Sequence, residues 1–123
     1  CYESIYGDLQ KGNTNLIAII TNDGWWRNTA GYKQHFDYAR LRAVEQRKMI
    51  IRSANTGISG VISPYGEVIE STNWDEAISI NTKVILSNKT TFYSIYGDYI
   101  GRLSVFVSVM LIIVAFVKGR LKK

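Results

Sequence analysis

The feature that most constrains this chain is an uncharged apolar stretch of fifteen residues near its end, at positions 103–117. As a helix rising about 1.5 Å per residue, it would extend ~22 Å, which is less than the ~30 Å hydrocarbon core of a bilayer. A helix that starts at Tyr99, with the Arg102 side chain reaching back to the membrane surface, extends ~28 Å. Tyr96 and Tyr99 then lie where aromatic side chains gather at membrane surfaces. The pattern predicts a transmembrane helix over residues 99–117; a buried core helix or a pair of valine-rich strands is the alternative.

The positive charge of the chain is concentrated in a tail after this stretch. The formal net charge is +5, and residues 118–123 carry four of the cations. The remaining chain is therefore nearly neutral and offers no general field for nucleic acid. Cationic residues beside a transmembrane helix favour the cytoplasmic side. We expect a basic cytoplasmic tail at 118–123 and residues 1–98 on the other side of the membrane.

The residues before the apolar stretch alternate between strand and helix patterns, as in one α/β domain. The run at 16–21 is continuously apolar and predicts a buried strand covered on both faces. A helix is predicted at 32–48, because Tyr32, Phe36, Ala39 and Ala43 form one apolar stripe while Arg40, Arg42 and Glu45 lie elsewhere. Further strands are predicted at 49–54, 58–63, 68–70 and 77–82.

Cys1, the only cysteine, is the candidate nucleophile. A thiol is a strong nucleophile when its pKa is lowered or a base removes its proton. Residues 3–10 predict a short helix ending near Gly12, and the free N–H groups at its start would favour a thiolate and hold an oxyanion. Three other interpretations remain open for Cys1: an inert thiol, the lipidated cysteine of a lipoprotein, or an N-terminal nucleophile.

A turn with two tryptophans follows the first predicted strand. Asn22, Asp23 and Gly24 form the turn, and Trp25 and Trp26 come next. This loop leaves the carboxyl end of a buried strand, where open α/β sheets bind ligands. Either one tryptophan packs while the other lies on the surface, or the pair binds substrate.

The only histidine, His35, lies beside the apolar stripe of the predicted helix. We expect a packing or hydrogen-bonding role for it. The chain has no further histidine or cysteine to complete a metal site with it, so no metal and no cofactor is expected.

Four motifs in this order resemble the apolipoprotein N-acyltransferases, a membrane-bound family of the carbon–nitrogen hydrolase (nitrilase) superfamily. They are Cys1-Tyr2-Glu3, the sequence TNDGWW at 21–26, QHF at 34–36 with ARLRAVE at 39–45, and RSANTGISG at 52–60. Each motif alone is weak, but the ordered set is specific, and the apolar stretch separates this family from soluble amidases of the superfamily.

The resemblance implies a fold and a place in a longer protein. The fold is the C-terminal part of an α/β/β/α sandwich at 1–98, followed by one transmembrane helix. The family's catalytic set is Glu, Lys and Cys, of which only the cysteine matches, at Cys1. The Glu and Lys would lie upstream, so we expect this chain alone to be inactive. We also expect its strands to expose apolar faces where the rest of the sandwich is missing.

The resemblance also implies a reaction and its partners. Cys1 would take an acyl chain from a phospholipid as a thioester and pass it to the α-amine of a diacylglyceryl-cysteine on an apolipoprotein. The backbone N–H of Tyr2 would hold the oxyanion, and Glu3 would support the catalytic groups or simply stabilise a helix start. Trp25 matches a position near the acyl site, and Trp26, Asn22 and Asp23 are expected to bind substrate in the same loop. The location would be the bacterial inner membrane, with the catalytic part in the periplasm.

Arg27 departs from the glycine expected after the aromatic pair. This departure leaves the conformation of the loop open. Two other functions also remain as alternatives: a membrane-tethered nitrilase-type amidase, and a non-enzymatic membrane-anchored lipoprotein domain. The coding sequence upstream of Cys1 would discriminate among them.

Overall fold

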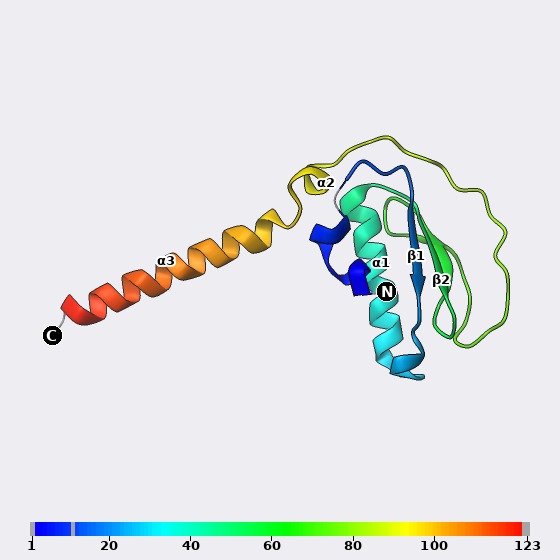
Figure 1. The fold of residues 1–123 in the computed structure, drawn as a ribbon, viewed down its shortest axis with the longest axis horizontal. Coiled ribbons are helices and arrows are strands. Elements are labelled where there is room, and N and C mark those ends of the chain that lie inside the picture. The colour runs from blue at the N-terminus through cyan, green and yellow to red at the C-terminus, as the bar shows by residue number, and fades with distance from the viewer. Residues whose placement is uncertain (1, 11, 122–123) are drawn as a thin grey trace.

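The computed structural model describes residues 2–10 and 12–121. A small α/β layer occupies one end of the molecule, and a long helix projects from it (Figure 1). The helices are α1 (Ala30–Gln46), α2 (Phe92–Tyr96) and α3 (Tyr99–Leu121), and the strands are β1 (Ile17–Thr21), β2 (Ile50–Ala54), β3 (Gly60–Ile62) and β4 (Val68–Ser71). Three short 3₁₀ helices complete the fold: η1 (Tyr2–Ile5), η2 (Gly7–Gln10) and η3 (Gly24–Trp26). This mixed α/β arrangement confirms the predicted fold class.

The sheet follows the order of its strands in the sequence, β1-β2-β3-β4. β1 and β2 are parallel and are connected through α1, whereas β3 and β4 pair in antiparallel fashion. The β1–β2 register places Ile19 opposite Arg52 and Thr21 opposite Ala54. The two parallel strands therefore end beside each other, at the edge from which the loop with the two tryptophans leaves.

The core lies between α1 and one face of the sheet. Its residues are Ile17, Ile19, Phe36, Ala39, Ala43, Ile50 and Ile62. The predicted apolar stripe of the helix is confirmed, because Tyr32 and the three α1 residues of that set are all buried. Arg42 lies off this stripe, as predicted, but it is not exposed. Its side chain is buried and pairs with Glu45 at 2.7 Å, since η2 and α2 cover this part of α1.

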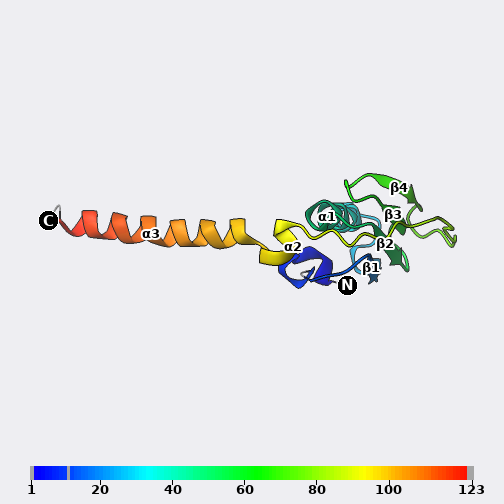
Figure 2. The same ribbon diagram turned by 90° about the horizontal axis from the view of Figure 1, so that it is seen from above.

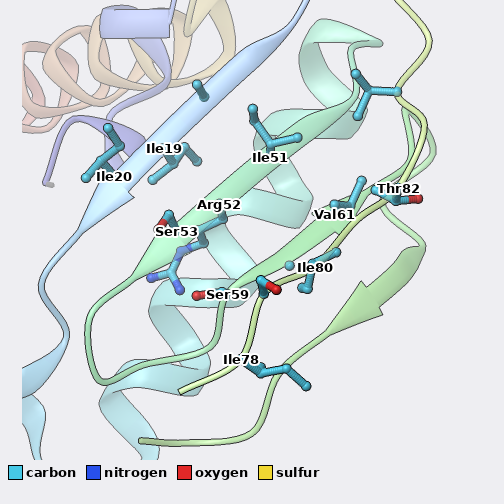
Figure 3. A pocket seen from close by; sticks show the side chains of 14 residues that line it. Ile19, Ile20, Ile51, Arg52, Ser53, Ser59, Val61, Ile78, Ile80 and Thr82 are labelled. Carbon is cyan, nitrogen blue, oxygen red and sulfur yellow. The ribbon is translucent and has the colours of Figure 1, made fainter. Parts of the chain in front are cut away.

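The other face of the sheet is open, so the prediction that the first strand is covered on both faces is wrong. Side chains alternate along β1, and Ile20, which points away from α1, is 82% exposed. Ile51 and Val61 line the same open side as Ile20, and with the passing segment 78–84 they bound a groove of about 580 Å³ (Figure 3). The exposed Ile20 matches the apolar exposure expected of an incomplete sandwich, whereas Val61 on the same face is buried.

The N-terminal segment forms two 3₁₀ turns in place of the single helix predicted over residues 3–10. Gly7, the first residue of η2, packs tightly on its neighbours. A Cβ at this position would overlap the guanidinium of Arg42 and the ring of Tyr93. The close approach to α1 and α2 therefore fixes the path of the chain more strongly than local helix propensity does.

The strand predicted at 77–82 does not form. The described chain between β4 and α2 has no strand, although its side chains alternate in the sequence. An alternating pattern makes a strand only where a neighbouring edge supplies hydrogen bonds. Instead, the buried Lys48 ammonium donates to the carbonyl oxygens of Ser87 and Lys89 and fixes the end of the segment between β4 and α2.

The helix α3 agrees with the predicted transmembrane segment and extends beyond it. Within Tyr99–Arg120, an 18-residue window has a mean hydropathy of 2.5, and none of that window is buried inside the described structure. Figure 2 shows α3 leaving the molecule beyond α2, with η1, η2 and α2 between it and the sheet. A helix this apolar and this exposed is suited to a lipid environment.

Candidate functional site

A buried polar cluster lies at the edge where β1 and β2 end. It consists of Asp23 from the turn after β1, His35 from α1 and Arg52 from β2, which are 0%, 1% and 3% exposed. Charged groups are rarely buried unless they are paired. Three such side chains from three elements indicate that this edge is built around their mutual contacts.

Asp23 is the centre of the cluster. His35 Nδ1 lies 2.9 Å from Asp23 Oδ1, and Arg52 Nη2 donates to Asp23 Oδ2 at 2.8 Å. The Thr21 hydroxyl also donates to Oδ1, at 3.2 Å. Burial by itself would raise the pKa of Asp23, but the hydrogen bonds and positive charge of His35 and Arg52 outweigh it, so the pKa of this carboxyl is below its ordinary value.

His35 connects this cluster to the N-terminal segment. Because an ionised Asp23 can only accept, His35 Nδ1 is the donor in the contact with Oδ1. The Ser4 hydroxyl lies 3.1 Å from Nε2, and Arg52 Nη2 lies 3.2 Å from Nδ1. The expected hydrogen-bonding role of His35 is confirmed, and its partners span α1, η1 and the turn after β1.

The NTG turn after β2 packs directly against the Asp23 side chain. A Cβ at Gly57 would overlap the Asp23 carboxylate, so only glycine fits there. Arg52 also donates to the carbonyl of Ile58 and lies over the Phe36 ring, with its Cζ 5.6 Å from the ring centroid. The RSANTG motif is thus the packing partner of the NDGWW motif.

Ser4, His35 and Asp23 follow one another in hydrogen-bonding order like a Ser-His-Asp triad. Ser4 is only 3% exposed and His35 is 1% exposed. A serine that no substrate can reach does not act as a nucleophile. The three hydrogen-bonded side chains therefore have a structural role below the protein surface.

The two tryptophans take different positions. Trp26 lies against α1, with its ring edge-on to His35 at 5.0 Å between centroids, and Gly31 leaves room for it. Trp25 is 83% exposed. The turn itself is fixed by Asn22, whose Oδ1 accepts from the backbone N–H of Gly24 at 3.0 Å. Of the loop residues expected to bind substrate, Asn22 and Trp25 are exposed, Trp26 is half-buried and Asp23 is fully buried.

The residues expected at the nucleophile are described only in part. Cys1 lies outside the described residues. Tyr2 begins η1, and its exposed ring lies 6.0 Å from the Trp26 ring and 6.3 Å from the His35 ring, between centroids. Glu3 is also exposed. The structure therefore brings the segment after Cys1 and the NDGWW loop together over His35.

Sequence reasoning did not identify Ser4, Arg52 or Gly57 as members of this site. Arg52 carried a usable signal, because a lone cation inside the apolar run of a buried strand needs a buried anion. Ser4 carried none, since a serine in a short polar segment has many possible partners. Among residues 2–10 and 12–121, no group of three or more metal-ligating side chains was found.

The fold and the cluster together define a class of protein: an α/β domain with one long apolar helix that could span a membrane, whose candidate site lies at the carboxyl ends of parallel strands. The apolipoprotein N-acyltransferase of Thermotoga maritima is 30% identical over 97% of the chain, and that of Rickettsia prowazekii is 34% identical over 92%. The Agrobacterium fabrum enzyme of the same name is 53% identical over 56% of the chain. No family model matches.

The chain is similar to apolipoprotein N-acyltransferases over most of its own length, as a fragment of such a protein would be. It spans 24%, 14% and 23% of the length of the Thermotoga, Agrobacterium and Rickettsia proteins. These shares agree with the expectation that it corresponds to one part of a longer enzyme.

Proposed function

We propose that this chain is the nucleophile-bearing part of an enzyme that transfers a fatty acyl chain from a phospholipid to an apolipoprotein. The acceptor is the α-amine of an N-terminal diacylglyceryl-cysteine. The observation that carries the proposal is the similarity to the apolipoprotein N-acyltransferase of Thermotoga maritima over 97% of the chain. That span includes both the α/β layer and the apolar helix α3, which soluble hydrolases of the superfamily lack.

The reaction runs in two covalent steps through Cys1. A glutamate upstream takes the thiol proton, and the sulfur attacks an ester carbonyl of the phospholipid. The C–O bond breaks, the proton passes to the leaving alcohol, and a lysophospholipid departs from the thioester. The acceptor amine then attacks the thioester carbonyl, the C–S bond breaks, and the released proton returns to the thiolate through the same glutamate.

Residues next to Cys1 have supporting roles in this proposal. The oxyanion of each tetrahedral intermediate is held by an upstream lysine and by the backbone N–H of Tyr2. Glu3 orients or tunes the catalytic groups, and the exposed Trp25 contacts the acyl chain. The packing of η1 on α1 supports this arrangement, because it keeps Tyr2 and the NDGWW loop adjacent.

The location of both substrates explains the anchor. A phospholipid and a diacylglyceryl protein both reside in a bilayer, and α3 would hold the catalytic layer at its surface. The basic residues at the end of α3 favour a cytoplasmic tail, which puts residues 1–98 in the periplasm of a bacterial inner membrane.

The test uses the full-length enzyme with a phospholipid bearing a labelled acyl chain and a diacylglyceryl-cysteinyl peptide. We expect labelled N-acyl peptide from the wild type and at least a 10³-fold loss in Cys1→Ala. Ser79→Ala, an exposed residue outside the site, is the matched control and should retain full activity. Ammonia release from a small amide without acyl transfer would instead show an amidase. Residues 1–123 alone should show no transfer, because the upstream Glu and Lys are missing.

A further inference from the structure

We propose that His35 is a positioning residue that holds the Cys1 segment and the NDGWW loop in one fixed arrangement. The inference rests on the proposed function and deepens it, because it names the group that aligns the nucleophile with the acyl-binding loop. His35 acts through its neighbours and does not touch the substrate.

The His35 side chain contacts both segments. On the N-terminal side, it binds the Ser4 hydroxyl at 3.1 Å and lies beside the Tyr2 ring, with centroids 6.3 Å apart. On the loop side, it binds Asp23 at 2.9 Å and receives the edge of Trp26. A change at His35 therefore reaches both segments at once.

The support beneath these contacts is rigid. His35 is near the start of α1, whose first turn is capped by the Thr29 side chain accepting from Gly31 N–H. Asp23 is fixed in turn by Arg52 at 2.8 Å. The hydrogen bonds that join Ser4 to His35, His35 to Asp23 and Arg52 to Asp23 are buried, where leaving a donor or acceptor unpaired is costly. The cluster thus has one well-defined arrangement, and it fixes the positions of the two segments that contact His35.

The consequence for catalysis follows from distance along the chain. Ser4 lies three residues after Cys1, so the Ser4–His35 hydrogen bond fixes the segment that directly follows the thiol-bearing residue. A misplacement of about 1 Å at a reacting atom costs roughly 10²-fold in rate. Loss of this hydrogen bond should slow thioester formation without weakening phospholipid binding to the same extent.

Two substitutions of His35 separate its two hydrogen bonds in the full-length enzyme. In His35→Asn the amide occupies the place of Nδ1, so it keeps the bond to Asp23 and loses the bond to Ser4. In His35→Gln the amide reaches the place of Nε2, so it keeps the bond to Ser4 and loses the bond to Asp23. Ser4→Ala removes the hydroxyl without changing the ring.

The measurement is the single-turnover rate of acyl-thioester formation on Cys1 at saturating phospholipid, together with KM and thermal stability. We expect Ser4→Ala and His35→Asn each to lower the saturating rate about 10- to 100-fold, with KM changed less than about threefold. The double variant Ser4→Ala/His35→Asn should be no slower than either single variant, because both substitutions remove the same hydrogen bond. His35→Gln should retain more activity than His35→Asn.

Ser63→Ala is the matched control for a purely structural effect. Ser63 is also buried, and its hydroxyl accepts from Tyr65 N–H and Glu67 N–H in the β3–β4 hairpin, away from the cluster. It should lose stability and keep its saturating rate. Should the His35 variants not fold, Ser4→Ala against Ser63→Ala decides the question.

Three outcomes would overturn the inference. One is a saturating rate in Ser4→Ala equal to that of the wild type. Another is an equal rate loss in Ser63→Ala at equal loss of stability. Either would leave the acyltransferase function intact. A wild-type enzyme that forms no thioester on Cys1 would instead reject the proposed function and this inference with it.

Discussion

Arg27 occupies a backbone conformation that glycine favours. Its φ of 49° and ψ of −162° follow the aromatic pair, at the residue where the family resemblance suggests glycine. A side chain in this region meets steric conflict worth about 1–3 kcal/mol. The loop therefore keeps a glycine-type path although the residue has changed.

We expect Arg27→Gly to stabilise the folded protein by about 1 kcal/mol, because relief of the steric conflict exceeds the entropy lost by glycine. Thermal or denaturant unfolding measures this change. Lys33→Gly, within α1 where φ is helical, is the control and should destabilise by about 1 kcal/mol. A lower melting temperature for Arg27→Gly would contradict the assigned loop conformation.

The depressed pKa of Asp23 predicts a specific response to acid. The folded protein keeps Asp23 ionised at pH values where the unfolded chain already binds a proton. Its stabilising contribution is thus fully present above the unfolded value of about 3.9 and is lost as the pH falls through the lower folded value.

Asp23→Asn should destabilise the protein by about 3 kcal/mol at neutral pH, since it leaves Arg52 without its buried anion. It should also flatten the dependence of unfolding free energy on pH below about 4. Chemical denaturation at a series of pH values measures both effects. Asp37→Asn, at an exposed ion pair with Arg40, should change stability by less than about 1 kcal/mol. A wild-type pH dependence in Asp23→Asn would contradict the role given to this carboxylate.

At the scale of elements, hydrophobic periodicity predicted the helices and strands whose formation depends on the local sequence. The stripe Tyr32–Phe36–Ala39–Ala43 gave α1 within two residues at each end, and the apolar runs gave β1 and β2. The failure at 77–82 has a different origin, because a strand depends on a partner edge that periodicity does not encode. The polar cluster was only partly predictable, since the pairing of Asp23 with Arg52 depends on the parallel register of β1 and β2.

The junction of η1 and η2 tests whether tertiary packing determines the N-terminal path. Gly7→Ala should destabilise the protein by about 1–3 kcal/mol, because the added methyl group meets Arg42 and Tyr93. Gly119→Ala is the control, since a Cβ there meets nothing. Denaturant unfolding of both variants gives the comparison, and a neutral Gly7→Ala would show that η1 and η2 are not packed as described.

At the scale of the whole molecule, α3 and the α/β layer meet through the N-terminal segment. Asp8 of η2 accepts from the backbone N–H of Asp98 at 2.9 Å and lies 3.4 Å from Arg102 Nη2. Both views place η1, η2 and α2 at the end of the layer nearest α3 (Figures 1 and 2). If α3 crosses the membrane, the segment after Cys1 is in the part of the layer closest to the lipid.

A charge in the middle of α3 tests whether this helix crosses a membrane. Val109→Lys should disfavour insertion by about 3 kcal/mol, whereas Val109→Leu should not. The measurement is the fraction of α3 that spans the bilayer in an insertion assay. Equal insertion of the lysine and leucine variants would contradict a lipid-facing helix.

The central claim is that Cys1 carries the acyl chain, and mass spectrometry of the full-length enzyme tests it most directly. The enzyme is incubated with phospholipid in the absence of acceptor, and its peptides are then examined for acylation. We expect one acyl chain on the peptide containing Cys1, released by neutral hydroxylamine as a thioester is, and no adduct in Cys1→Ala. An adduct on another residue, or none on Cys1 in an enzyme that still acylates apolipoprotein, would contradict it.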